Sequence, residues 1–160
     1  MSKTITQFRW LVTMLLLVTA MVMPKMAWAE PYDNNGFAKD GSYQPATPTT
    51  DQYDINGDGT KDEVYEIGNA GQLYWFAALV NGTLESETKN TSANAVLTAN
   101  ITVNKDLLAS VNEDGTLIDG KTVVSWTPIG KDQNPYTGTF DGQGHTISGL
   151  YLDNSVISVQ

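Results

Sequence analysis

Glycines placed at short intervals between single apolar residues constrain this chain more than any other feature. They gather in the segment PYTGTFDGQGHTISGLYL, residues 135–152. Glycine supplies the backbone angles that tight bends need, and isolated apolar residues point into a narrow core. Short strands joined by such bends are typical of stacked β rungs rather than of helical or doubly wound domains. The glycines are Gly138, Gly142, Gly144 and Gly149, and the apolar residues are Phe140, Ile147, Leu150 and Leu152.

The N-terminal segment, residues 1–29, is predicted to be a secretory signal peptide. Two basic residues precede an apolar run at 10–23, which is too short to span a bilayer comfortably. Small side chains at Ala27 and Ala29 predict cleavage before Glu30. An uncleaved membrane anchor is the alternative, which the short run and the proline after it disfavour. We therefore expect a secreted or cell-surface protein with no membrane insertion after cleavage.

Charge and cysteine content exclude several classes of partner and site. The chain has 9 basic and 18 acidic residues, net −9. Three of the basic residues and none of the acids lie in the predicted signal, so the exported part carries 6 against 18, net −12. Nucleic acids and anionic membranes need basic patches and are therefore not expected partners. The acidity permits divalent cations, although solubility explains it equally well. The absence of cysteine excludes disulfides, thiolate metal sites and lipoprotein attachment.

A linker and a helix are predicted to follow. Residues 30–52 are rich in Asn, Asp, Gly, Pro, Ser and Thr, which predicts a flexible linker. Residues 70–80 predict a helix, with Asn69 as its N-cap and Gly82 ending it. Its Tyr74–Trp75 pair is interpreted as packing rather than as a sugar-stacking site. The apolar residues at helical spacing are Leu73, Phe76, Ala77 and Val80.

The pattern from Asn94 onward is β. Residues 105–120 between the strands are polar and predict turns. The strands amount to one or two rungs, whereas a solenoid needs about three, so we expect a truncated array. The predicted strands are 96–103, 123–126, 136–140, 145–147, 150–152 and 155–159.

Residues 53–66 contain a candidate calcium loop. Oxygen-bearing side chains alternate along DINGDGTKD, residues 54–62, and Gly59 permits a sharp turn. Tyr65 stands where an EF-hand loop has its bidentate Glu, and the segment resembles instead the helix-free DxNGDGxxD calcium loops of extracellular proteins. An ion-free Asp/Asn/Gly turn is the alternative. We expect a structural Ca²⁺ with a Kd on the order of 10⁻⁴ to 10⁻³ M. The ligands that this resemblance implies are the side chains of Asp54, Asn56, Asp58 and Asp62 and the carbonyl of Thr60.

Three blocks together, residues 65–82, 126–130 and 135–152, resemble the start of secreted bacterial β-helix proteins with GLUG-type repeats. Those are adhesin-like surface proteins, found especially in gut bacteria, and similar repeats occur beside some IgA-cleaving metalloproteases. The resemblance implies a right-handed parallel β-helix, a pectin-lyase-like solenoid, with a capping helix and first rungs over residues 67–160. It also implies a non-catalytic surface protein that binds host or dietary glycans or proteins. The alternative is the non-catalytic β-helix region of a secreted protease or polysaccharide-degrading enzyme.

Catalytic signatures are missing from the sequence, and we expect no enzyme. The lone histidine, His145, lies in a glycine bend without a nucleophile-elbow motif, and it is interpreted as a turn residue. The chain has no HExxH motif and no phosphate-binding glycine loop before a helix. Carboxylates that a glycosidase would need as a pair are scattered between turns.

Overall fold

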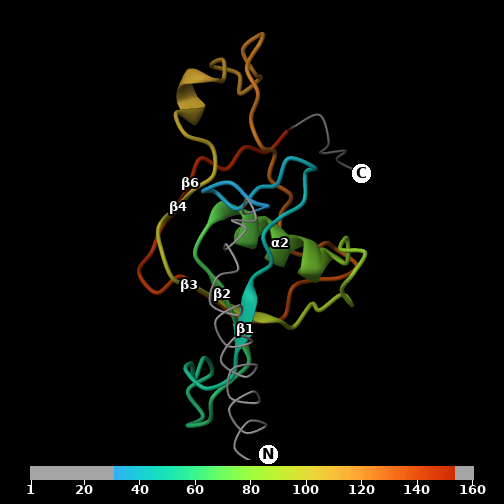
Figure 1. Cartoon of the computed structure of the whole chain (residues 1–160), viewed down its shortest axis with the longest axis vertical. Helices are drawn as coiled ribbons and strands as arrows, with labels where there is room; N and C mark the ends of the chain where they lie inside the picture. The colour runs from blue at the N-terminus through green and yellow to red at the C-terminus, as the bar shows by residue number, and fades with distance from the viewer. Residues whose placement is uncertain (1–30, 154–160) are drawn as a thin grey trace, which may run out of the picture. The chain divides into compact units, whose positions relative to one another are not determined.

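The computed structural model describes residues 31–153 (Figure 1). Helix α2 (Ala70–Asn81) is the longest element of this part. The predicted signal peptide with its cleavage point, and the predicted strand at 155–159, lie outside the described residues. Within the described residues, no helix has the length and apolarity to cross a membrane. The other elements are β1 (Thr47–Thr49), β2 (Val64–Ile67), β3 (Asn94–Leu97), β4 (Ile101–Thr102), the 3₁₀ helix η1 (Leu107–Ala109), β5 (Phe140–Asp141) and β6 (Ile147–Ser148).

The strands form two small sheets. One has the order β1-β2-β3-β5, in which β1 runs antiparallel to β2 and the other pairs are parallel. The other sheet consists of β4 and β6, which are parallel. The register places Tyr65, Ala95 and Phe140 side by side across three strands, and it pairs Ile101 with Ile147. The predicted strand at 123–126 is reduced to an isolated bridge to Tyr151.

The prediction of a mainly β fold that begins a right-handed parallel β-helix is wrong. The described residues form a small mixed sheet and one helix, and they contain no solenoid. Glycine bends and single apolar residues specify tight turns and short strands, and residues 135–152 supply both. They do not specify what packs against those strands. Here α2 supplies the largest block of buried side chains, so the core is built from a helix and sheets rather than from stacked rungs.

Helix α2 has the predicted ends but a different environment. The Asn69 side chain accepts a hydrogen bond from the Gln72 N–H, and Gly82 is left-handed with φ 70°, so both predicted caps are confirmed. Ten of its 12 residues are buried, however, rather than one face alone. A helix that is apolar all round lies inside a core. It is therefore the centre of the fold and not a lid over one end.

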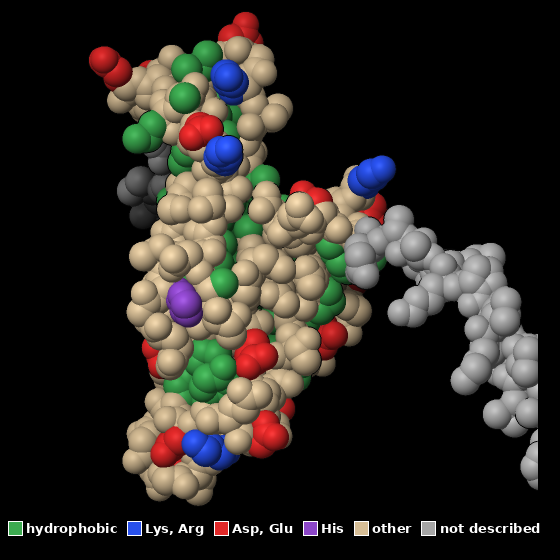
Figure 2. All heavy atoms as spheres, turned by 60° about the vertical axis from the view of Figure 1, so that its left-hand side comes forward, with side chains coloured by type: hydrophobic (Ala, Val, Ile, Leu, Met, Phe, Trp, Pro, Cys, Tyr) green, Lys and Arg blue, Asp and Glu red, His purple; other side chains and the backbone are tan. Residues whose placement is uncertain are grey.

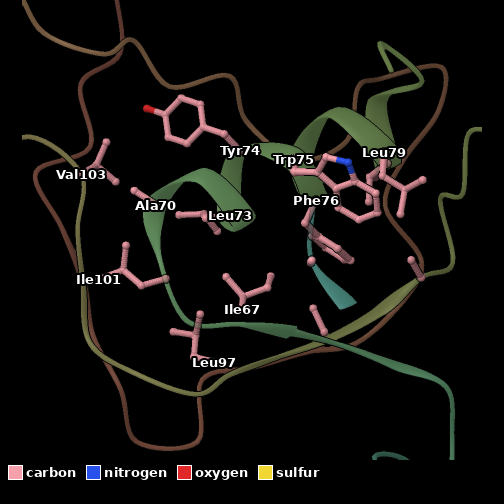
Figure 3. Close-up of a cluster of buried hydrophobic side chains, with 14 residues drawn as sticks. Ile67, Ala70, Leu73, Tyr74, Trp75, Phe76, Leu79, Leu97, Ile101 and Val103 are labelled. Carbon is pink, nitrogen blue, oxygen red and sulfur yellow. The ribbon is translucent and has the colours of Figure 1, made fainter. Parts of the chain in front are cut away.

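The core lies between α2 and the two sheets. Figure 3 shows Leu73 and Phe76 pointing from α2 toward Ile67 of β2, with Leu97 of β3 and Ile101 of β4 around them. Ile67, Leu73 and Phe76 are no more than 1% exposed. No polar or charged side chain is buried among the described residues. The hydrophobic effect therefore dominates the stability of this part of the chain.

The segment predicted as a flexible linker is partly built into the fold. It contains β1, and Phe37 and Tyr43 pack edge-on or tilted against Tyr74 of α2, with ring centroids 5.4 and 5.5 Å away. The Gly71 N–H donates to the Asn35 carbonyl at 2.7 Å, which ties the segment to the first turn of α2. Turn-forming composition predicts the bends in this segment, but aromatic contacts with α2 hold them in place.

An excursion leaves the fold between β4 and β5. We call residues 105–124 the excursion; Figure 1 shows it in yellow and orange, extending away from the sheets. Asn104 closes its base, because its amide accepts from the Val124 N–H at 2.7 Å and donates to the Val124 carbonyl at 2.9 Å. The same amide donates to the Gly149 carbonyl at 2.8 Å. The Asn104 side chain, directly before the excursion, therefore binds Val124 at its end and Gly149 next to β6.

Candidate functional site

The candidate calcium loop is held together by its own hydrogen bonds. Asp54 accepts from the backbone N–H groups of Gly57, Asp58 and Gly59 at 2.8–3.1 Å. Asp62 accepts from the Ile55 N–H at 2.9 Å, which closes the loop at its far end. Five N–H donors and five carboxyl or amide oxygens meet inside nine residues. These contacts are those of consecutive Asx turns.

Asp58 accepts hydrogen bonds through both of its carboxylate oxygens. Its Oδ1 accepts from both the N–H and the hydroxyl of Thr60, and its Oδ2 accepts from the Asn56 amide at 3.1 Å. The hydrogen bonds from Thr60 lower the pKa of the Asp58 carboxyl below its ordinary value. The group is fully exposed, so this effect carries little energy. An aspartate of ordinary pKa is already charged at neutral pH, so the lowered pKa reflects the turn's hydrogen bonds rather than an ion site.

The loop supplies the oxygen chemistry that Ca²⁺ prefers, but it does not assemble a metal cluster. Among residues 31–153, no group of three or more His, Cys, Asp or Glu side chains is arranged to hold an ion. The Asp54, Asn56 and Asp58 side chains are instead turned toward the loop's own N–H groups. Each carboxylate oxygen has a second lone pair, so these hydrogen bonds do not use all of its capacity as a ligand. The predicted calcium site therefore stays a prediction.

The excursion carries a second candidate site, which the sequence analysis missed. A hollow of about 520 Å³ opens beside η1, with apolar walls from Leu107, Leu108 and Ala109. Thr102 of β4 and Ser148 of β6 also line it, with hydroxyl oxygens 3.2 Å apart. The remaining lining residues are Asn104, Asp106 and Gly149. The hollow thus combines an apolar wall with hydroxyl, amide and carboxylate groups.

Exposed apolar side chains concentrate on the same excursion. Leu108 is 89% exposed, and Leu117, Ile118 and Val124 are each 36% exposed. Among the large hydrophobic residues exposed in the described part, only Leu152 lies elsewhere. We call these four side chains and the hollow the excursion surface. In the sequence, this surface could have been recognised from isolated leucine and isoleucine residues within an otherwise polar, turn-rich stretch.

Tyr74, Trp75 and His145 lie where packing or turn formation accounts for them. Tyr74 and Trp75 are 5% and 7% exposed, as the interpretation of packing predicted, and they present no stacking platform. Burial raises the pKa of the Tyr74 hydroxyl well above its ordinary value. The His145 N–H donates to the Gly142 carbonyl at 2.7 Å, which confirms that His145 lies in a tight turn.

Comparisons with protein-family models, curated proteins and solved structures gave no significant match to this chain. The resemblance to GLUG-type proteins is therefore a prediction that rests on the sequence blocks alone.

Proposed function

We propose that this chain is an exported, non-catalytic binding module of an adhesin-like surface protein, and that its excursion surface contacts glycans or proteins outside the cell. The exposure of Leu108 and its neighbours carries this proposal. Leu108 is 89% exposed and lines the apolar wall of the hollow, and exposed apolar patches mark interaction sites. The secretory pattern at the N-terminus supports an extracellular setting.

The make-up of the hollow favours a sugar among the ligands. A sugar ring has apolar C–H faces as well as hydroxyl groups. Leu107 and Leu108 offer an apolar wall to the first, while Thr102, Ser148 and Asp106 offer hydrogen-bonding groups to the second. Small-molecule sites commonly combine an apolar lining with a few polar groups in this way.

Binding to printed glycans and immobilised proteins tests the proposal. The exported protein, labelled at its N-terminus, is applied to arrays of mucin-type and plant cell-wall oligosaccharides and to extracellular-matrix proteins. We expect a bound class whose signal is lost in Leu108→Ser. Because Leu108 is 89% exposed, this variant should melt at the temperature of the wild type.

Leu152→Ser is the matched control, since Leu152 is exposed but lies off the excursion. It should bind as the wild type does. The proposal is wrong if the wild-type protein binds nothing on the arrays, or if Leu108→Ser and Leu152→Ser bind equally well.

We also propose that the loop at 54–62 binds Ca²⁺ weakly and in a structural role. The supporting observation is the alternation of oxygen-bearing side chains in a loop whose carboxylate oxygens keep a free lone pair. Asp54, Asn56, Asp58, Asp62 and the Thr60 carbonyl would hold the ion. Bound Ca²⁺ would fix the connection between β1 and β2.

A further inference from the structure

The two sheets end on the same segment of chain. β5 is the last strand of the four-stranded sheet, and β6 is the second strand of the smaller one. Only the bend at 142–146 separates them, and the His145–Gly142 hydrogen bond tightens that bend. Among residues 31–153, no strand pairs with the outer side of β5 or β6. We call residues 139–148 the terminal edge.

Backbone groups of the terminal edge point outward. The Ala95 N–H donates to the Thr139 carbonyl at 2.9 Å, so Thr139 and Asp141 face β3 with their backbone groups. Because successive residues of a strand turn these groups to opposite sides, the N–H and C=O of Phe140 face away. The same reasoning applies to Ile147, since its neighbours Thr146 and Ser148 are the ones bonded to β4.

The core is also open at this edge. The neighbouring strands β3 and β4 carry buried side chains at this point: Ala95 is 0% exposed and Ile101 is 2% exposed. Their partners Phe140 and Ile147 point toward the same core but are only half-buried. A further strand on the terminal edge would cover both side chains and satisfy the outward backbone groups.

The terminal edge has few of the charged side chains that oppose pairing with another chain at an exposed strand. The whole chain has 18 acidic and 9 basic residues, yet residues 135–152 contain Asp141 as their only charged side chain. The Asp141 carboxylate is bonded to the Gln143 N–H at 2.9 Å and to the Gln143 amide. Figure 2 shows a mostly uncharged surface around His145. The opposite edge differs, because β1 contains Pro48, which has no N–H to donate.

We propose that two copies of this chain pair through the terminal edge, with β5 of one copy antiparallel to β5 of the other across a two-fold axis. A second copy fits because the like-charged surfaces of an acidic protein repel each other, and the terminal edge, with Asp141 as its one acidic side chain, offers a contact with little charge. Antiparallel pairing brings Phe140 opposite the same residue of the second copy, and the two residues exchange both N–H···O=C bonds. A two-fold contact of this kind closes on itself.

Sedimentation velocity over a wide range of concentrations tests this pairing. The exported protein should shift from monomer to dimer as its concentration rises. In Thr139→Lys/Asp141→Lys the dimer should be lost, because the pairing places residue 139 of one copy opposite residue 141 of the other, so that lysines would face each other, and like charges directly opposite oppose pairing. Thr139 is exposed, and the side-chain hydrogen bonds of Asp141 reach only Gln143, so the variant should stay folded, which its melting temperature checks. Thr47→Lys, which places the same charge on exposed β1, is the control and should dimerise normally.

A cross-linking measurement keeps the test decisive if the lysine variant unfolds. The chain has no cysteine, so Thr139→Cys/Asp141→Cys introduces the only thiols. Around the Phe140 pair, residue 139 of one copy lies opposite residue 141 of the other at a Cα separation of about 4.5 Å, within the range of a disulfide. Mild oxidation should give a covalent dimer, and Thr47→Cys should not.

Three results would each overturn the pairing. They are a wild-type protein that stays monomeric at every concentration, a lysine variant that dimerises like the wild type, and open-ended assemblies in place of dimers.

Discussion

Gly71 shows how one residue decides where the N-terminal segment packs. It lies in the first turn of α2, and a Cβ built on it would lie 1.9 Å from the Gly36 carbonyl oxygen. Gly36 in turn has φ 84° and approaches the Asn69 side chain, which caps the helix. The close approach of two backbones is therefore possible only because residue 71 has no side chain.

Replacing this glycine should destabilise the protein, although alanine is the better helix former. In an exposed helix, Gly→Ala stabilises by about 0.5–1 kcal/mol. In Gly71→Ala the clash with Gly36 should instead lower the free energy of unfolding by about 1–3 kcal/mol. Urea denaturation measures the difference.

The control for this substitution is Gly142→Ala. A Cβ there would meet only the His145 carbonyl, at 3.7 Å, and should change the free energy of unfolding by less than about 0.5 kcal/mol. A Gly71→Ala variant more stable than the wild type would mean that residues 31–44 do not pack on α2 in solution.

At the scale of elements, Tyr136 connects the segment before β5 to the residue before β3. Its hydroxyl donates to the Ala93 carbonyl at 2.8 Å, and its ring packs edge-on against Phe76 of α2. Burial raises the pKa of Tyr136 to about 12 from the ordinary value of 10.0. The folded protein therefore holds this proton more tightly than the unfolded chain does.

This difference predicts a loss of stability in alkali. Below about pH 10 both states are protonated, and the contribution of Tyr136 is fully present. It is lost as the pH rises through about 12, because the unfolded chain ionises first. Urea unfolding between about pH 9 and about pH 12 should show a steeper decline for the wild type than for Tyr136→Phe. Parallel curves would contradict the raised pKa.

The loop at 54–62 makes a separate prediction. Millimolar Ca²⁺ should raise the melting temperature of the wild type, by an amount equivalent to about 1.4 kcal/mol at ten times the Kd. Asp58→Ala should remove the shift, because it deletes a predicted ligand. Scanning calorimetry with and without the ion provides the measurement.

Asp114 provides a matched control for that experiment. It accepts from the N–H and hydroxyl of Thr116 just as Asp58 does from Thr60, and its pKa is lowered for the same reason. Asp114→Ala therefore breaks the same kind of turn outside the loop and should keep the calcium shift. Equal loss of the shift in both variants would rule out a site at 54–62.

At the scale of the molecule, the excursion and the core are separable. The core residues run from Ala46 to Val103, while no residue of η1 is buried. Joining Lys105 to Val123 through two glycines should therefore change the free energy of unfolding by less than about 1 kcal/mol, because loop length affects stability only weakly. Urea denaturation of the shortened protein tests this.

Asn104→Ala in the full chain is the comparison. It removes hydrogen bonds to Val124 and Gly149, and it should lower the free energy of unfolding by about 1–3 kcal/mol. If the shortened protein is less stable than Asn104→Ala, then the excursion contributes to the core after all.

Much of the local structure is predictable from residues close together in the chain. The Asn69 cap, the start of α2 at Ala70 and the left-handed Gly82 follow from side chains within four positions of one another. The turns at Gly115 and Gly120 are also found where the sequence predicts them, with φ of 83° and 76°. The geometry of the loop at 54–62 follows from its Asx turns, although its ligand does not.

Contacts between distant residues escape the same reasoning. The excursion surface was missed because the exposure of Leu108 depends on what lies beside η1 and not on neighbouring residues. The packing of residues 31–49 does not follow from the composition that predicts a flexible linker, because Phe37 and Tyr43 contact Tyr74, more than 30 residues away. Composition indicates that such a segment bends, but not what it touches.

The sequence by itself determined the ends of the helix and the glycine turns, because each depends on interactions within one or two turns of chain. It did not determine the strand lengths, since the predicted strand at 96–103 is divided into β3 and β4 and the one at 136–140 is reduced to β5. Only the tertiary structure decided that α2 is buried all round and that β3 pairs with β5 across 45 residues. The physical reason is that burial and strand pairing draw their free energy from the summed packing of the whole core. The same local pattern is compatible with a stacked coil and with the mixed sheet that this chain forms.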